Sequence, residues 1–85
     1  MNVRYTRLFL KQYGKLPDRI QEEFDEKLGL LLGDLHYPSL RTKKIKSHAN
    51  IWEASVTMDY RFTFKIEEEV LILRKIGTHN ILQNP

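Results

Sequence analysis

The stretch that most constrains the fold runs from Asp59 to Asn80 and reads DYRFTFKIEEEVLILRKIGTHN. Its first half alternates apolar and polar side chains, which is the period of a strand with one buried face. The alternating apolar residues are Phe62, Phe64 and Ile66. Glutamates at positions 67–69 interrupt this pattern, and a run that is apolar on both faces follows at positions 70–73. The stretch therefore predicts a hairpin whose second strand lies deep in a sheet.

The two ends of this hairpin carry side chains suited to chemistry on a phosphate. Arg61 opens the first strand and His79 follows the second, so antiparallel pairing brings both residues to the same end of the hairpin. Arginine donates hydrogen bonds from a planar fork, and histidine exchanges protons near neutral pH. We expect one phosphate-sized site shared by both residues. Taken alone, Arg61 also fits a solvated charge, and His79 also fits an ordinary loop residue.

Length and composition narrow the class of protein. With 85 residues the chain is expected to form a single domain over residues 1–85, and no stretch approaches the ~20 apolar residues of a membrane span. The absence of cysteine excludes disulfides, thiolate metal sites and thiol nucleophiles, and it is compatible with a cytoplasmic protein. The N-terminal residues lack the pattern of a signal peptide. A net charge of +3 favours a polyanion or an acidic protein as partner.

Two amphipathic helices are predicted from residue 6 onward, and Gly33 followed by Tyr37-Pro38-Ser39 ends the second one. A short strand at residues 2–5 precedes them, and Thr6 can cap the first helix. Gly14 and Pro17 separate the helices, and proline suits the first turn of the second one. The apolar face of the second helix contains Ile20, Phe24, Leu28, Leu31 and Leu35. A helical hairpin of this kind has to place its apolar stripe on a flat surface.

The residues that follow are predicted to supply that surface. Further strands are expected at residues 43–47 and 51–58, ahead of the hairpin. Trp52, Ala54, Val56 and Met58 share one face of the second of these strands. The order is β-α-α-β-β-β-β, an α+β domain with an N-terminal strand, a helical hairpin and a four-stranded, mainly antiparallel sheet. The expected core residues are Phe9, Phe24, Leu28, Leu31, Trp52, Phe62, Phe64 and Ile72.

In this order the segments resemble the RelE/ParE superfamily of toxins from type II toxin–antitoxin systems. The resemblance rests on LFLKQYGKLP before a long helix, LHYPSLRTKKIK, NIWEASVTMDYRFTFKI and LILRKIGTH, which cover nearly the whole chain. The ending Gly77-Thr78-His79 is similar to the YafQ and YoeB branches, which are mRNA endoribonucleases acting at the ribosome. ParE-like relatives share the fold but inhibit DNA gyrase, so the fold alone does not select the target.

The resemblance implies a ribosome-dependent, metal-independent endoribonuclease that cleaves mRNA and so inhibits translation. It also implies a small, acidic antitoxin as partner, a cytoplasmic location, and neither a cofactor nor a membrane partner. No His/Asp/Glu spacing in the sequence suggests a metal site. Two alternatives stay open, namely a ParE-like gyrase inhibitor without catalysis and an inactive homologue that only binds its antitoxin.

Individual roles follow from the same resemblance. Arg61 matches the strand arginine that contacts the scissile phosphate, and His79 matches the histidine used in acid–base work. Asp59 matches an aspartate of the YafQ-like site. The residues expected to contact RNA are Lys43, Lys44, Lys46 and Lys75. The lysines at positions 43–46 equally suit an edge strand that is protected against aggregation.

The sequence departs from the family pattern at the position of the general base. Ser55 stands where YafQ-like sequences carry a second histidine, Ala54 stands near a RelE-like lysine, and residues 42–44 lack the YoeB-like glutamate. Metal-free cleavage uses the 2′-OH of the substrate as nucleophile and needs a base, an acid and a cation beside the phosphorane. The candidates for the base are Asp59, Glu53 and one of the lysines, with Asp59 ranked first.

Overall fold

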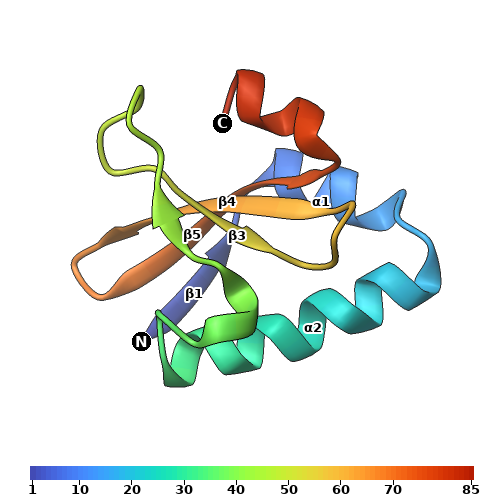
Figure 1. Ribbon diagram of the computed structural model, residues 1–85, viewed down its shortest axis with the longest axis horizontal. Helices are drawn as coiled ribbons and strands as arrows, with labels where there is room; N and C mark the ends of the chain where they lie inside the picture. Colours follow the sequence, from blue (N-terminus) through green and yellow to red (C-terminus); the bar gives the residue numbers. More distant parts are fainter.

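The computed structural model describes residues 1–85 as a five-stranded sheet with two α-helices (Figure 1). The strands are β1 (Asn2–Tyr5), β2 (Lys43–Lys44), β3 (Trp52–Ser55), β4 (Arg61–Glu67) and β5 (Val70–Gly77). The helices are α1 (Arg7–Gly14) and α2 (Asp18–Gly33), with short 3₁₀ helices η1 (Pro38–Leu40) and η2 (His79–Gln83). This order confirms the predicted β-α-α-β-β-β-β architecture, but the sheet has five strands instead of the predicted four because β1 joins it. Neither α-helix combines the length and the apolar character that a membrane crossing needs.

The sheet is mixed, with the strand order β1-β5-β4-β3-β2. The β4–β5 hairpin lies at its centre, and Glu68 and Glu69 form the turn between these strands with φ angles of 48° and 65°. β1 pairs with β5 in parallel, whereas every other pair is antiparallel. The N-terminal strand therefore completes one edge of the sheet, next to the most apolar strand.

Thr6 caps α1, as the sequence predicts, and it also anchors the start of this helix to β5. The Thr6 hydroxyl oxygen accepts a hydrogen bond from the Phe9 backbone N–H at 3.2 Å, which caps the helix. The same hydroxyl donates to the Leu73 carbonyl at 2.9 Å. One turn later the side-chain oxygen of Gln12 accepts from the Ile76 N–H at 3.0 Å. These contacts fix α1 along β5.

Aromatic contacts place the helical hairpin on one face of the sheet. The Phe24 ring of α2 meets the Phe62 ring of β4 edge-to-face at a centroid distance of 5.1 Å. Phe9 of α1 lies 5.3 Å from Phe24, which joins the two helices. The predicted core residues that are buried on this face are Phe9, Phe24, Leu28, Leu31, Phe62 and Phe64.

Two predicted core residues behave differently. Trp52 is half-buried, because its ring stacks on Phe64 while the Lys44 ammonium lies 5.3 Å from the ring centroid at the sheet edge. Ile72 is buried, but it pairs with Lys65 and lies outside the main cluster. Since Phe64 and Leu73 are paired on the helical face, alternation puts Ile72 on the opposite face.

The two middle strands are shorter than predicted. The first spans only Lys43–Lys44 instead of residues 43–47, because a turn begins at Ile45, whose carbonyl accepts from the His48 N–H. The second spans Trp52–Ser55 instead of residues 51–58. It ends there because the backbone N–H groups of both residues that follow, at positions 56 and 57, bond to the Tyr60 carbonyl and close a tight loop. Met58 lies in this loop and is 83% exposed, so its predicted place beside Trp52 is wrong.

The face of the sheet opposite the helices, called the open face below, carries the C-terminal segment (Figure 1). Thr63 alternates with Phe62 and Phe64 and so points to this face, where its hydroxyl donates to the Pro85 carbonyl at 3.0 Å. The Arg74 Nε atom donates to the same carbonyl at 3.2 Å. Arg74 follows Leu73 of the helical face, so alternation puts its side chain on the open face, and a β-bulge leaves it without a partner on β4.

Candidate active site

Arg61 lies at the centre of a polar cluster on the open face. Its neighbours across the sheet are Ser55 of β3 and Gly77 of β5. Because the chain leaves β5 at Gly77 and enters η2, His79 lies just beyond the pairing partner of Arg61. The Arg61 side chain is only 14% exposed, so the sheet holds its guanidinium in place.

The guanidinium of Arg61 contacts three side chains, two from β3 and one from the start of η2. Its Nε atom donates to His79 Nε2 at 3.2 Å. Its Nη1 atom donates to Ser55 Oγ at 3.1 Å and lies 3.5 Å from Glu53 Oε1. The structure thus brings Arg61 and His79 together at one end of the hairpin.

Glu53 enters this site as the acidic partner of Arg61. Its side chain is 9% exposed, and a carboxylate so deeply buried needs a cationic partner. Glu53 is not among the residues that the sequence resemblance matches to catalytic positions. The sequence feature that could identify Glu53 is its alternation with Trp52 and Ala54. This alternation puts Glu53 and Ser55 on the face of Arg61.

Asp59 takes no part in the cluster. It is exposed in the loop between β3 and β4, where its backbone N–H donates to Thr57 Oγ1 at 3.2 Å. The side chain lines a separate cleft that includes Arg19 and Glu23 of α2. No hydrogen bond or ion pair joins Asp59 to Arg61 or His79.

The lysines of β2 point to opposite faces of the sheet. Lys43 pairs with Glu53, and directly opposed residues share a face, so Lys43 belongs to the open face. Lys44 pairs with Trp52 and covers its ring, so it lies on the helical face. Both lysines are exposed at the edge of the sheet.

The other two lysines also lie apart from each other. Lys75 pairs with Thr63 on the open face, where its ammonium group bonds the Asn84 carbonyl. Lys46 is exposed in the loop between β2 and β3. The structure therefore gathers Lys43 and Lys75 on the face of Arg61 and leaves Lys44 and Lys46 outside it.

This arrangement combines a fixed cation with an imidazole and a buried carboxylate that each contact it. A guanidinium of this kind can hold a phosphate and stabilise charge that develops on it. The imidazole and the carboxylate are groups that can transfer protons on either side of that phosphate. No three side chains among the histidines, aspartates and glutamates come together as a metal site.

Comparison with known proteins gives matches among solved structures only. No family model matches the sequence, and neither does any curated protein. The structure of YafQ from E. coli strain BL21(DE3) matches with a TM-score of 0.79 at 20% identity, over 95% of this chain and 96% of that chain. A YoeB/ParE toxin from Agrobacterium tumefaciens matches with a TM-score of 0.80 at 15% identity, over 93% of this chain and 99% of that chain.

A third match is the RelB–RelE antitoxin–toxin complex from Methanococcus jannaschii, with a TM-score of 0.78 at 17% identity and 95% coverage of both chains. These similarities span nearly the full length of each toxin. The chain therefore has the fold of the RelE/ParE toxins, and the resemblance expected from the sequence is confirmed at the level of the fold.

Proposed function

We propose that the chain is the toxin of a toxin–antitoxin pair and that it cleaves mRNA on the ribosome without a metal ion. The observation that carries this proposal is the placement of the Arg61 guanidinium 3.2 Å from His79 and 3.5 Å from Glu53. The fold, which known toxins share, supports the toxin part of this proposal and does not by itself select the target.

In the proposed reaction the 2′-OH of the RNA attacks the neighbouring phosphorus. Glu53 accepts the 2′-OH proton as the O2′–P bond forms, and Arg61 stabilises the charge of the phosphorane. His79, protonated once substrate has bound, gives its proton to the 5′-oxygen as the P–O5′ bond breaks. We assign the base to Glu53 and not to Asp59, because Glu53 is in contact with Arg61 whereas Asp59 is in the loop beyond β3.

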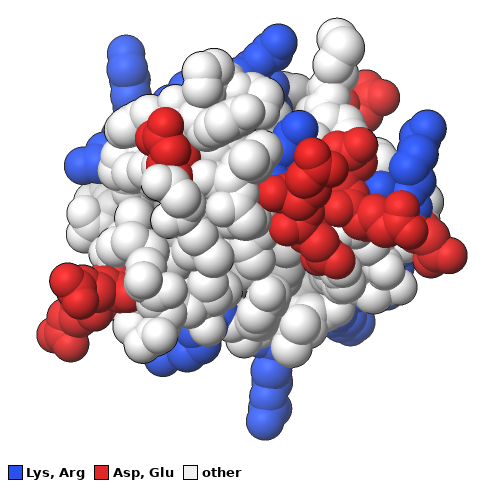
Figure 2. Space-filling view, turned by 90° about the horizontal axis from the view of Figure 1, so that it is seen from below, with Lys and Arg blue, Asp and Glu red and all other residues white.

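The charge distribution favours RNA on the open face. On the opposite side of the molecule, acidic side chains gather over α2 (Figure 2). The acidic residues of α2 are Asp18, Glu22, Glu23, Asp25 and Glu26. A polyanion is repelled there and attracted to the open face, where Lys43 and Lys75 accompany Arg61. We propose Lys43 and Lys75 as RNA contacts on the open face. Lys44 and Lys46 are proposed as further RNA contacts outside this face.

The proposed partner is a small antitoxin with both acidic and apolar residues. The helical hairpin leaves Leu8, Leu10 and Leu32 exposed, which provides apolar surface for such a chain. A structural match that is itself an antitoxin–toxin complex supports this assignment.

The test is primer extension on mRNA isolated from cells shortly after the chain is expressed. The proposal predicts discrete breaks within translated messages. Intact message together with broken DNA would instead support a gyrase inhibitor. Intact message and intact DNA in growing cells would indicate a homologue that only binds its antitoxin.

A further inference from the structure

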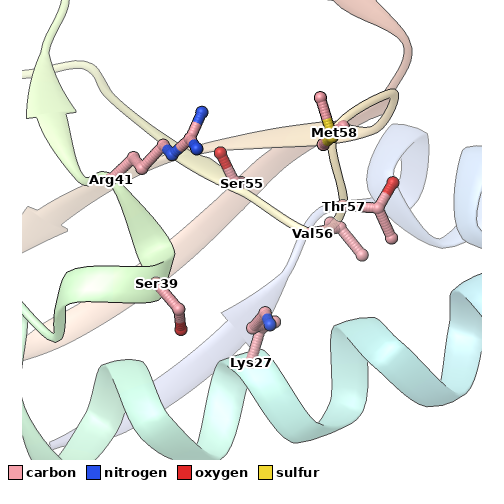
Figure 3. A pocket seen from close by; sticks show the side chains of 7 residues that line it. All are labelled: Lys27, Ser39, Arg41, Ser55, Val56, Thr57 and Met58. Atoms are coloured by element: carbon pink, nitrogen blue, oxygen red, sulfur yellow. The ribbon is translucent and has the colours of Figure 1, made fainter.

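A second cationic cleft lies beside the Arg61 site, at the end of β3 (Figure 3). It has a volume of about 150 Å³. Its lining comes from α2, from the η1 region and from the chain that leaves β3, and the polar residues among them are Lys27, Ser39, Arg41, Ser55 and Thr57. Ser55 belongs to both sites, because its hydroxyl accepts a hydrogen bond from Arg61 at 3.1 Å.

The cleft has the chemistry of an anion site. It contains two cations and three hydroxyl groups, and no carboxylate lines it. Lys27 forms an ion pair along α2, with its Nζ atom 3.9 Å from Glu23 Oε2, and its side chain is 18% exposed. The Arg41 guanidinium makes no ion pair in the chain. Figure 3 shows this guanidinium beside Ser55, with Lys27 rising from α2 on the other side of the cleft.

The backbone at Arg41 gives an independent reason to regard it as more than a surface charge. It follows η1 in the left-handed conformation, with φ 50° and ψ 42°. Glycine and asparagine adopt this conformation most easily, whereas a long side chain is strained there. A left-handed residue commonly ends a helix, and Asn50, Glu68 and Glu69 also have positive φ angles in turns, so the conformation matters here for where it directs the side chain. Here the strained residue places an unpaired guanidinium in the cleft.

We propose that this cleft binds a backbone phosphate of the RNA next to the phosphate held by Arg61. This inference rests on the proposed ribonuclease function. It adds a second contact that fixes how the RNA strand lies across the protein. Two anionic groups held on either side of Ser55 suit consecutive phosphates of one strand. Because Arg41 and Lys27 are both cations, the cleft favours an anionic phosphate group over a neutral ligand.

The test is a cycle that combines one protein substitution with one chemical change in the RNA. Single-turnover cleavage is measured on ribosomes programmed with mRNA in which one phosphate at a time is a neutral methylphosphonate. Arg41→Asn removes the guanidinium and retains a residue suited to the left-handed backbone. On unmodified mRNA it is expected to slow cleavage by roughly tenfold to a hundredfold, the effect of one lost charged hydrogen bond. Lys15→Gln, at the end of α1, is the control and is expected to cleave at the wild-type rate.

The decisive result is the coupling between the Arg41 substitution and the neutral phosphate in the mRNA. On mRNA that is neutral at one particular phosphate other than the scissile one, Arg41→Asn is expected to cleave as fast as the wild-type protein. Thermal unfolding of Arg41→Asn at or above the wild-type midpoint separates lost binding from lost folding. Wild-type rates on unmodified mRNA, or a defect that persists whichever phosphate is neutral, would overturn the inference and leave the ribonuclease proposal intact. Failure of the wild-type protein to cleave any of these messages would overturn both.

Discussion

The Nε atom of Arg61 donates a hydrogen bond to the Nε2 atom of His79 across 3.2 Å, although the residues are 18 positions apart in the chain. Arginine N–H groups only donate hydrogen bonds, so His79 Nε2 is the acceptor in this contact. In the mechanism proposed above, a phosphate takes over the Arg61 donors and so frees Nε2 for proton transfer, which links substrate binding to the acid role of His79.

Truncation of a central aromatic residue tests the core. Phe64 is fully buried between β3 and β5, and Phe64→Ala is expected to lower the free energy of unfolding by about 3–5 kcal/mol. Met58→Ala is the control, because its side chain is 83% exposed and should change stability by less than about 0.5 kcal/mol. Urea denaturation gives both values. Equal losses of unfolding free energy for Phe64→Ala and Met58→Ala would contradict the observed register of β4, which buries Phe64.

The stability of the helical hairpin is expected to fall in alkali because of Tyr13. Burial, together with a 2.9 Å hydrogen bond to Asp25, raises the pKa of Tyr13 to about 12. A group whose pKa is higher in the folded state stabilises fully below its unfolded pKa of ~10 and loses that contribution as the pH rises to its folded value. The wild-type protein should therefore lose stability relative to Tyr13→Phe between pH ~10 and ~12. A constant difference between the two proteins over this range would contradict the assigned cause.

Gly77 provides a test of how η2 positions His79. A Cβ atom at this position would lie 3.0 Å from the Ile81 side chain of η2, so in Gly77→Ala this side chain has to give way by a few tenths of an ångström. We expect a modest fall in cleavage rate with little loss of stability, because pressure on η2 shifts His79 from its place beside Arg61 and a misplaced catalytic group slows the reaction. Gly29→Ala is the control. Its Cβ meets nothing within 4 Å, so it should keep full activity and raise helix stability by about 1 kcal/mol.

The assignment of the general base is tested by two matched amide substitutions. Glu53→Gln keeps the shape of the side chain and an oxygen for Arg61, but it cannot accept the 2′-OH proton. We expect it to reduce the cleavage rate by ~10²–10⁴-fold. Asp59→Asn should change the rate only slightly, since this carboxylate lies outside the cluster. A large loss of rate in Asp59→Asn together with a small loss in Glu53→Gln would instead identify Asp59 as the general base.

The sequence predicts those parts of the fold that depend on local patterns. The alternation at Phe62 and Phe64 identifies a half-buried strand, and Thr6 marks the start of α1. The ends of the strands depend on particular backbone hydrogen bonds, which the alternation of side chains does not specify. β3 ends at Ser55 because the Tyr60 carbonyl captures two backbone N–H groups, a contact that no local pattern specifies.

The same distinction applies to the candidate site. The proximity of Arg61 and His79 follows from the antiparallel hairpin, which the sequence predicts. The contact of Glu53 with Arg61 depends on the register between β3 and β4, in which Ser55 opposes Arg61. The cleft at Arg41 depends on a left-handed residue after a 3₁₀ helix, and an arginine gives no signal for that conformation.

The most direct test of the ribonuclease account is the single-turnover cleavage rate of mRNA on programmed ribosomes by purified wild-type, Arg61→Ala and His79→Ala proteins. We expect Arg61→Ala to slow cleavage ~10²–10³-fold, the cost of one donor to a developing oxyanion. His79→Ala should slow it ~10²–10⁴-fold through loss of the acid, with thermal unfolding close to wild type because the side chain is exposed. Wild-type cleavage rates from a folded His79→Ala protein would contradict the account.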